Sequence, residues 1–147
     1  MPAVATTIQY LIRMISNEMK IKADRLLEPY GITQEQAQIL RFIFEHESKA
    51  ITQNDLIETF NLKGATVSST LTSLKKRKLI EHFVDEADTR KKLVGLSRTA
   101  YKEVRDIIEV LNRVEAVIFE GIPEADRDAL KSILITMHDN LQELDEM

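Results

Sequence analysis

The sequence feature that most constrains the fold is residues 51–98, where two short helical patterns are followed by two short strand patterns. Thr52 and Asp55 form a helix-start signal, because a threonine side chain can accept the backbone N–H of a residue in the first turn. A turn follows, and a second helix is expected over 65–78. Its apolar positions recur at steps of three and four residues, as one buried helix face requires; they are Val67, Leu71 and Leu74.

The remaining faces of this second helix carry short hydroxyl side chains and no carboxylate. Surface helices usually prefer Glu and Lys to Ser and Thr, whose helix propensity is lower. Short hydrogen-bonding side chains can approach base edges and phosphates closely, although a solvated helix face is the alternative. The candidates for a major-groove face are Thr66, Ser68, Ser69 and Thr72, and those for phosphate contacts are Lys63, Lys75 and Lys76.

A β-hairpin with a long polar tip is expected after the second helix. Its strands are predicted at 79–84 and 93–96, with charged residues between them. Such a tip can place a cation in the minor groove beside a helix in the major groove. Arg90 suits this role, with Asp88 orienting it through a charge-assisted hydrogen bond and Lys91 assisting. An ordinary solvated tip is the alternative.

The tip and the following strand read DEADTRKKLVGLS, residues 85–97, and follow a helix whose pattern includes Thr66-Val67-Ser68. Together they resemble the MarR family of bacterial transcriptional regulators, and the resemblance extends over nearly the whole chain. It implies a mainly α fold with a small β-wing (α+β), a winged helix-turn-helix whose N- and C-terminal helices form a dimerisation domain. Two positions depart from the family: Lys78 stands where a Gly is usual, and Ser69 where a basic residue is common.

The charge distribution agrees with a nucleic-acid partner although the net charge of the chain is −4. Residues 61–105 contain 11 Lys and Arg against 5 Asp and Glu, a net charge of +6. Residues 106–147 contain 3 against 11, a net charge of −8. The positive charge is therefore concentrated where phosphates are expected, and the acidic part is expected to face away from them.

Several classes of protein and site are disfavoured by what the chain lacks. It has no cysteine, no apolar run long enough to cross a membrane and no basic-then-apolar N-terminal segment, so a cytoplasmic location is expected. No catalytic motif and no cofactor motif is present, which argues against an enzyme and predicts no cofactor. His46, His82 and His138 lack ligand spacing, so no metal site is predicted; their convergence with Glu18 is the alternative.

Four further helices are expected around the 51–98 stretch. The first spans 5 to about 29 and ends at Gly31, and the second follows a capping box that begins at Thr33. Ser97 is expected to cap a helix to about Glu120, and Pro123 to occupy the first position of the last helix. The predicted boundaries are thus 33–97 for the DNA-binding lobe, and 5–30 and 98–147 for the dimerisation helices.

The terminal helices have apolar stripes that a single copy of the chain would leave exposed, so an intertwined homodimer is expected. Two recognition helices would then lie roughly 34–36 Å apart on a pseudo-palindromic DNA site. The family resemblance also implies a small-molecule effector, such as an organic anion, that shifts the dimer population away from DNA binding. Candidate pocket residues are Tyr10, Arg13, Met14, Asn17 and Arg41; ordinary interface residues are the alternative.

The sequence therefore predicts a homodimeric double-stranded DNA-binding regulator, most often a repressor in this family. The alternative is a helical protein–protein interaction module without specific DNA binding. The C-terminal helices alone would fit that alternative, whereas the hydroxyl-rich helix and the charged hairpin would not.

Overall fold

The structure is a computed structural model that describes residues 7–145. The chain divides into two compact units, the first ending at Val114 and the second beginning at Glu115. The elements in chain order are α1 (Ile8–Leu27), η1 (Glu28–Tyr30), α2 (Gln34–Glu45), β1 (Ile51–Thr52), α3 (Gln53–Phe60), α4 (Gly64–Lys76), β2 (Ile80–Val84), β3 (Lys92–Leu96), α5 (Tyr101–Ile118) and α6 (Glu124–Leu144). The mainly α fold with a small β-wing is confirmed.

Local signals explain where the helices of the first unit begin and end. Thr33 and Thr52 each form a reciprocal capping box, which satisfies backbone N–H groups that a helix start would otherwise leave open. Gly31 ends η1 in the left-handed region at a φ of 68°, where a Cβ would be unfavourable. Asn61 adopts the same region at the end of α3, and Asn tolerates it better than most residues.

The core of the first unit is built from the apolar faces of its helices and one face of its sheet. In α4 the side chains of Val67, Leu71 and Leu74 are buried as the spacing predicts. Burying one such side chain contributes roughly 1.5–3 kcal/mol. The largest fully buried side chains are Leu27, Ile39, Leu40, Ile43, Leu56, Val67, Leu74, Leu79, Ile80, Val104 and Ile107.

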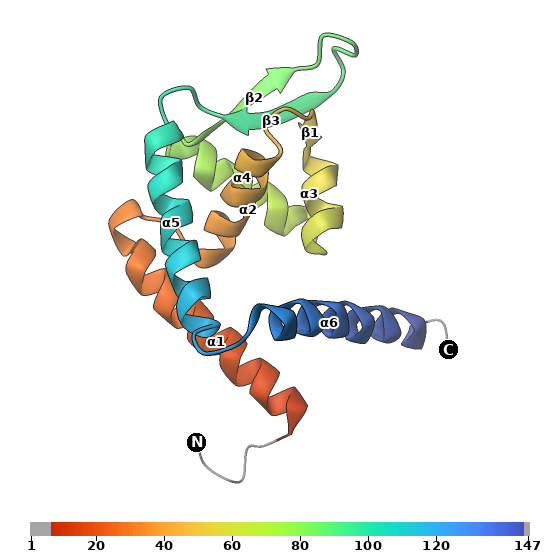
Figure 1. Ribbon diagram of the computed structural model, residues 1–147. Coiled ribbons are helices and arrows are strands. Elements are labelled where there is room, and N and C mark those ends of the chain that lie inside the picture. Colours follow the sequence, from red (N-terminus) through yellow and green to blue (C-terminus); the bar gives the residue numbers. More distant parts are fainter. Residues whose placement is uncertain (1–6, 146–147) are drawn as a thin grey trace. The chain divides into compact units, whose positions relative to one another are not determined.

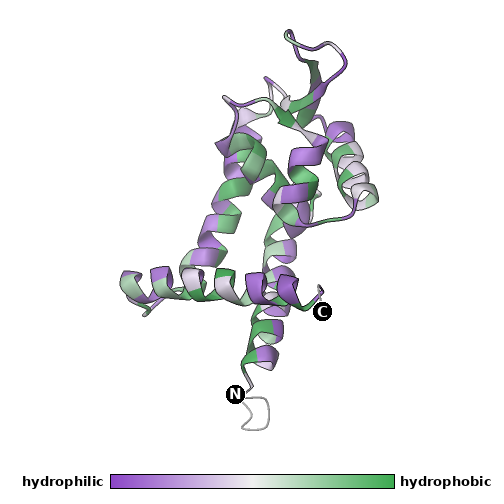
Figure 2. Cartoon of the chain, turned by 90° about the vertical axis from the view of Figure 1, so that its right-hand side faces the viewer, coloured by the Kyte–Doolittle hydropathy of each residue, from purple (hydrophilic) through white to green (hydrophobic). Residues whose placement is uncertain are grey.

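The sheet has three antiparallel strands in the order β1–β3–β2 (Figure 1). Ile51 pairs with Val94, so the short strand before α3 joins the hairpin as the third strand of the sheet. In the hairpin, Ile80 pairs with Leu96, and this end is buried. The other end extends away from the helices of the first unit and carries the polar tip, which is hydrophilic in Figure 2.

Some predicted boundaries were wrong. Ser97 does not cap α5: the segment 97–100 forms a turn, closed by a bond from the Ala100 N–H to the Ser97 carbonyl, and the helix begins at Tyr101. Ser97 is instead buried beside the sheet, where its N–H donates to Leu79. Pro123 is the N-cap of α6 and not its first helical residue. The predicted helix over 65–78 is α4 over 64–76, because Lys78 turns the chain.

At the start of the chain, Thr7 caps α1 through its side chain, which accepts the N–H of Tyr10. The predicted start of the first helix at residue 5 and the predicted end of the last segment at 147 lie outside the described residues. Within residues 7–145, none of the helices is long and apolar enough to cross a lipid bilayer.

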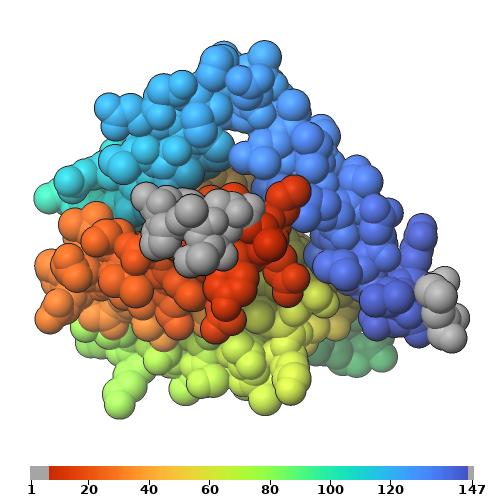
Figure 3. Space-filling model, turned by 90° about the horizontal axis from the view of Figure 1, so that it is seen from below, coloured from red at the N-terminus to blue at the C-terminus, as the bar shows by residue number. Residues whose placement is uncertain are grey.

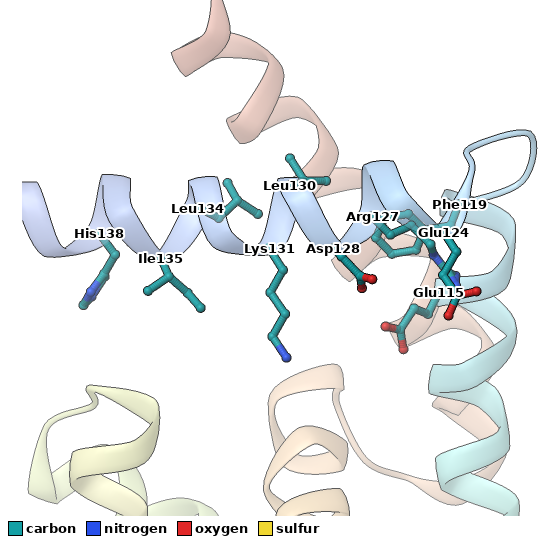
Figure 4. Close-up of a pocket in the computed structure, with 10 residues that line it drawn as sticks. All are labelled: Glu115, Phe119, Glu124, Arg127, Asp128, Leu130, Lys131, Leu134, Ile135 and His138. Carbon is teal, nitrogen blue, oxygen red and sulfur yellow. The ribbon is translucent and has the colours of Figure 1, made fainter.

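In the second unit, α6 exposes most of its apolar side chains, and Figure 2 shows hydrophobic and hydrophilic residues interspersed along this helix. A shallow pocket runs along it, and Lys131, Ile135 and His138 point to the same side of the helix there (Figure 4). Near one end of this pocket, the Arg127 guanidinium lies 4.4 Å from the centre of the Phe119 ring, a cation–π contact. The apolar positions that are at least 40% exposed are Val117, Ile122, Leu130, Ile133, Leu134, Ile135, Leu141 and Leu144.

Candidate nucleic-acid interface

The predicted recognition helix, α4, has one buried face and one open face. The buried face is anchored by Val67, Leu71 and Leu74, so the hydroxyl side chains between them must point outward. All four candidates for the major-groove face are exposed: Thr66, Ser68, Ser69 and Thr72. The Thr72 hydroxyl donates a hydrogen bond to the Ser68 carbonyl, with 2.9 Å between the two oxygens, so the hydroxyl oxygen remains available mainly as an acceptor.

A groove runs between α4 and the first turn of α2, and the sequence did not reveal it. From α4 it is lined by residues that include Thr66 and Ser69, and from α2 by Glu35 and Gln36. Although α4 itself contains no Asp or Glu, Glu35 therefore places a carboxylate beside its open face. That carboxylate disfavours an anion such as a phosphate at this point of the surface.

The tip of the wing is an ordered loop held by two aspartates. Asp85 accepts the Ala87 N–H at 2.9 Å, and Asp88 accepts the Arg90 N–H at 3.1 Å. The Asp88 carboxylate also accepts the Arg90 Nε at 3.0 Å and Nη2 at 3.4 Å. The predicted orienting contact between these two side chains is present.

The electrostatics of this contact explain how a cation can be held in solvent. The hydrogen bond from the Arg90 side chain is the main cause that lowers the pKa of Asp88 below its ordinary value of 3.8. Asp88 is half-buried, whereas 90% of the Arg90 side chain is exposed. The carboxylate therefore restrains the guanidinium without covering it, and Lys91 beside it is exposed as well.

His82 lies on β2, near the end of α4, and on the same face of the strand as Ile80. Although His82 is largely exposed, its partial burial, followed by the nearby charges of Lys75 and Lys92, lowers its pKa below the ordinary value of 6.5. A groove at this junction is lined by residues that include Lys75, Lys78 and His82. The sequence indicated the position of His82 on a strand, but not its proximity to the end of α4.

The basic residues at the ends of α4 differ in their surroundings. Lys63 is the exposed N-cap, and Lys75 and Lys76 are exposed in the last turn, where cations also stabilise the helix dipole. Lys78 has a φ of 61°, which explains why a Gly is usual at this turn in the family that the sequence resembles. Arg77, by contrast, is engaged in intramolecular contacts.

The predicted ligand-pocket residues lie on two helices of the first unit. Tyr10, Arg13 and Asn17 are exposed and Met14 is half-buried on α1, whose open surface is visible in Figure 3. Arg41 is half-buried on α2 and donates 3.2 Å to the Asn112 side chain of α5. The four α1 positions are spaced by three, one and three residues, so they share one side of the helix.

The three histidines occupy separate environments. His46 stacks on Phe42 with ring centres 4.1 Å apart, and its Nδ1 lies 2.8 Å from the Phe42 carbonyl. His138 lies 3.9 Å from Asp139 on α6. In the part of the chain from 7 to 145, no group of three His, Asp or Glu side chains is arranged to hold a metal ion.

A helix-turn-helix with an exposed hydroxyl face, followed by a hairpin that presents an oriented arginine, defines the winged-helix class of DNA-binding domains. A sequence model of the MarR family matches residues 30–91. No curated protein matches the chain. The chain is similar to MepR of Staphylococcus aureus in a crystal structure of the MepR–DNA complex, with 36% identity, 92% of this chain and 96% of that chain covered, and a TM-score of 0.84.

Two further crystal structures extend the comparison. MepR, described as a transcription regulator of the S. aureus multidrug efflux pump MepA, matches at 36% identity over 92% of this chain and 98% of that chain, with a TM-score of 0.65. The transcription regulator MarR from Oenococcus oeni PSU-1 shares the fold at 24% identity, with 90% and 99% covered and a TM-score of 0.81. This chain belongs to the MarR family and is a DNA-binding transcriptional regulator.

Proposed function

We propose that this chain is a homodimeric repressor that binds a pseudo-palindromic operator. In this proposal α4 enters the major groove and presents Thr66, Ser68, Ser69 and Thr72 to base edges. Lys63, Lys75 and Lys76 contact phosphates, while Arg90 enters the minor groove with Asp88 and Lys91 beside it. The observation that carries the proposal is the exposed Arg90 side chain, oriented by Asp88 in a hairpin that follows a helix whose exposed face has no carboxylate of its own.

The homodimer is supported by the apolar surface of the terminal helices. On α1, Ile8, Ile12 and Ile15 are at least 41% exposed, and α6 carries several more such side chains. Several large exposed apolar side chains on one helix indicate a surface that another chain covers. In the proposed assembly, segments 5–30 and 98–147 form the dimerisation domain and 33–97 the DNA-binding lobe.

Release by a small molecule is the regulatory part of the proposal. The α1 residues Tyr10, Arg13, Met14 and Asn17, together with Arg41, offer cationic, polar and adaptable apolar groups to an organic anion. A ligand that binds better to dimers with unsuitable lobe spacing would weaken DNA binding by its differential affinity for the two states. MepR, as the regulator of a multidrug efflux pump, offers a precedent for control of transport genes.

Selection of genomic fragments by the purified protein tests the proposal, with the affinity of the best fragment then measured against salt concentration. Enrichment of a pseudo-palindrome whose affinity falls steeply with salt is expected, because bound cations release counterions from DNA. Transcription from a promoter containing that fragment should fall when the protein is added. Failure to enrich any sequence at several salt concentrations would instead favour a helical protein–protein interaction module.

A further inference from the structure

Arg77 lies in the basic run Lys75–Lys78 at the end of α4, and its side chain contacts residues that are distant in sequence. Its Nη2 donates a hydrogen bond to the Tyr30 carbonyl and lies 3.9 Å from the Glu103 Oε1. Its guanidinium also lies against Gly31, where an added Cβ would be only 2.9 Å from Nη1. Although 44% of the Arg77 side chain is exposed, its guanidinium is therefore held against the protein by these contacts.

These contacts, which we call the Arg77 bridge, join three segments that are distant in sequence. Tyr30 and Gly31 form the corner between α1 and α2, Arg77 is the C-cap of α4, and Glu103 lies in the first turn of α5. The corner is suited to this contact because Gly31 leaves room for the planar guanidinium. A charge-assisted hydrogen bond also fixes direction, which apolar packing does not.

The position of the bridge makes it effective in setting the angle of α4. The buried face of the helix fixes its depth through Val67, Leu71 and Leu74, but apolar contacts tolerate small rotations. Thr66 lies eleven residues before Arg77, about 16 Å along the helix axis. A tilt of roughly 5° at the bridge would displace that end by about 1.4 Å, enough to break hydrogen bonds to base edges.

We propose that Arg77 is a positioning residue for DNA recognition, which sets the angle of α4 through Tyr30 and Glu103 and does not itself contact a phosphate. This inference rests on the proposed function, since it concerns the same recognition helix. The proposed role of Arg77 therefore differs from that of the adjacent lysines, whose exposed side chains can approach the DNA backbone.

The test compares Arg77→Lys with Lys76→Ala, using the full chain. Arg77→Lys keeps the charge but replaces the planar donor set with a single ammonium, whereas Lys76→Ala removes an exposed charge one residue away. Each variant is titrated at several salt concentrations with two duplexes of equal length, one selected by the wild-type protein and one of random sequence. Hydrogen exchange of the α4 amides is measured on the free proteins.

Arg77→Lys is expected to weaken binding to the selected duplex about tenfold while leaving the random duplex and the salt slope unchanged. It should also speed exchange in α4 relative to the wild-type protein. Lys76→Ala should weaken both duplexes, lower the salt slope and leave exchange unchanged. Arg77→Ala, which removes both the charge and the hydrogen-bond donors, should weaken binding to the selected duplex as much as Arg77→Lys does.

The proposal is overturned if Arg77→Lys retains wild-type affinity and exchange, or if Arg77→Ala reproduces the salt-slope change of Lys76→Ala. The latter result would make Arg77 a phosphate contact. If the wild-type protein selects no duplex, the proposed function fails. The hydrogen-exchange data then test the Arg77 bridge independently of DNA binding. Unchanged exchange in both Arg77 variants refutes the bridge, and faster exchange supports its effect on α4.

Discussion

The contact between Asp88 and Arg90 makes a prediction about how two substitutions in the wing combine. Arg90→Ala removes a side chain that is 90% exposed, so its loss costs little folding stability. A minor-groove contact of this kind contributes on the order of 1–3 kcal/mol, or roughly 2–6 kcal/mol over two half-sites. The expected loss of operator affinity is therefore at least about 30-fold.

Asp88→Asn changes the same site in a different way. It weakens the 3.0 Å contact that orients the Arg90 guanidinium, so the side chain must be ordered when DNA binds. It also removes a negative charge from a loop that approaches phosphates, which favours binding. In the wild-type background the loss of orientation should dominate, with roughly three- to tenfold weaker binding. In the Arg90→Ala background only the charge effect remains, so Asp88→Asn should strengthen binding slightly.

Fluorescence anisotropy at one pH and one salt concentration measures the affinity for the selected duplex of four proteins: the wild type, Arg90→Ala, Asp88→Asn and the double variant. Lys91→Ala serves as the control for removal of a neighbouring positive charge, and circular dichroism checks that the wing variants remain folded. A change of the same sign and size for Asp88→Asn in both backgrounds would refute the orienting role of Asp88. An affinity of Arg90→Ala within twofold of wild type would remove Arg90 from the minor groove.

Three further predictions concern stability and assembly. The folded-state pKa of His82 is below its ordinary value of 6.5, so its stabilising contribution is present above pH 6.5 and is lost as the pH falls through the folded-state value. The urea midpoint should therefore fall more between pH 7.5 and 5.5 for the wild-type protein than for His82→Gln. Gly95→Ala would place a Cβ 2.7 Å from the Phe83 ring and should lower the free energy of unfolding in urea by about 1–3 kcal/mol. The double variant Gly95→Ala/Phe83→Leu should regain part of this stability. If the double variant is as unstable as Gly95→Ala, the strain lies elsewhere. Ile133→Asp, at a side chain 55% exposed on α6, should shift the protein toward monomer in sedimentation by at least about tenfold in dissociation constant, whereas an unchanged dimer would exclude this face from the interface.

Much of the secondary structure of this protein could be predicted from short segments of sequence. Thr33 and Thr52 begin helices because each side chain reaches a backbone N–H only three residues away. Gly31 ends the first helical segment because a residue without a Cβ adopts positive φ without strain. The Asp88–Arg90 contact was also predictable, since its two residues are separated by a single position in a loop.

Other features depended on contacts that no local pattern contains. Ser97 resembled a helix cap, but packing against the sheet buries it, and the helix begins at Tyr101. Lys78 adopts a left-handed conformation despite its Cβ, because the chain must turn between α4 and β2. The terminal residues of a helix depend on the direction that the next segment takes, so sequence periodicity locates a helix more accurately than its ends.

The composition of the interface was determined by the sequence, and its electrostatics by the tertiary structure. The hydroxyl face of α4 follows from a 3.6-residue period, which is a property of the helix alone. The low pKa of His82, the Glu35 carboxylate beside α4 and the Arg77 contact with Tyr30 all join residues from different elements. Electrostatic interactions and hydrogen bonds depend on distance in space, and only the folded chain brings residues 30, 77 and 103 together.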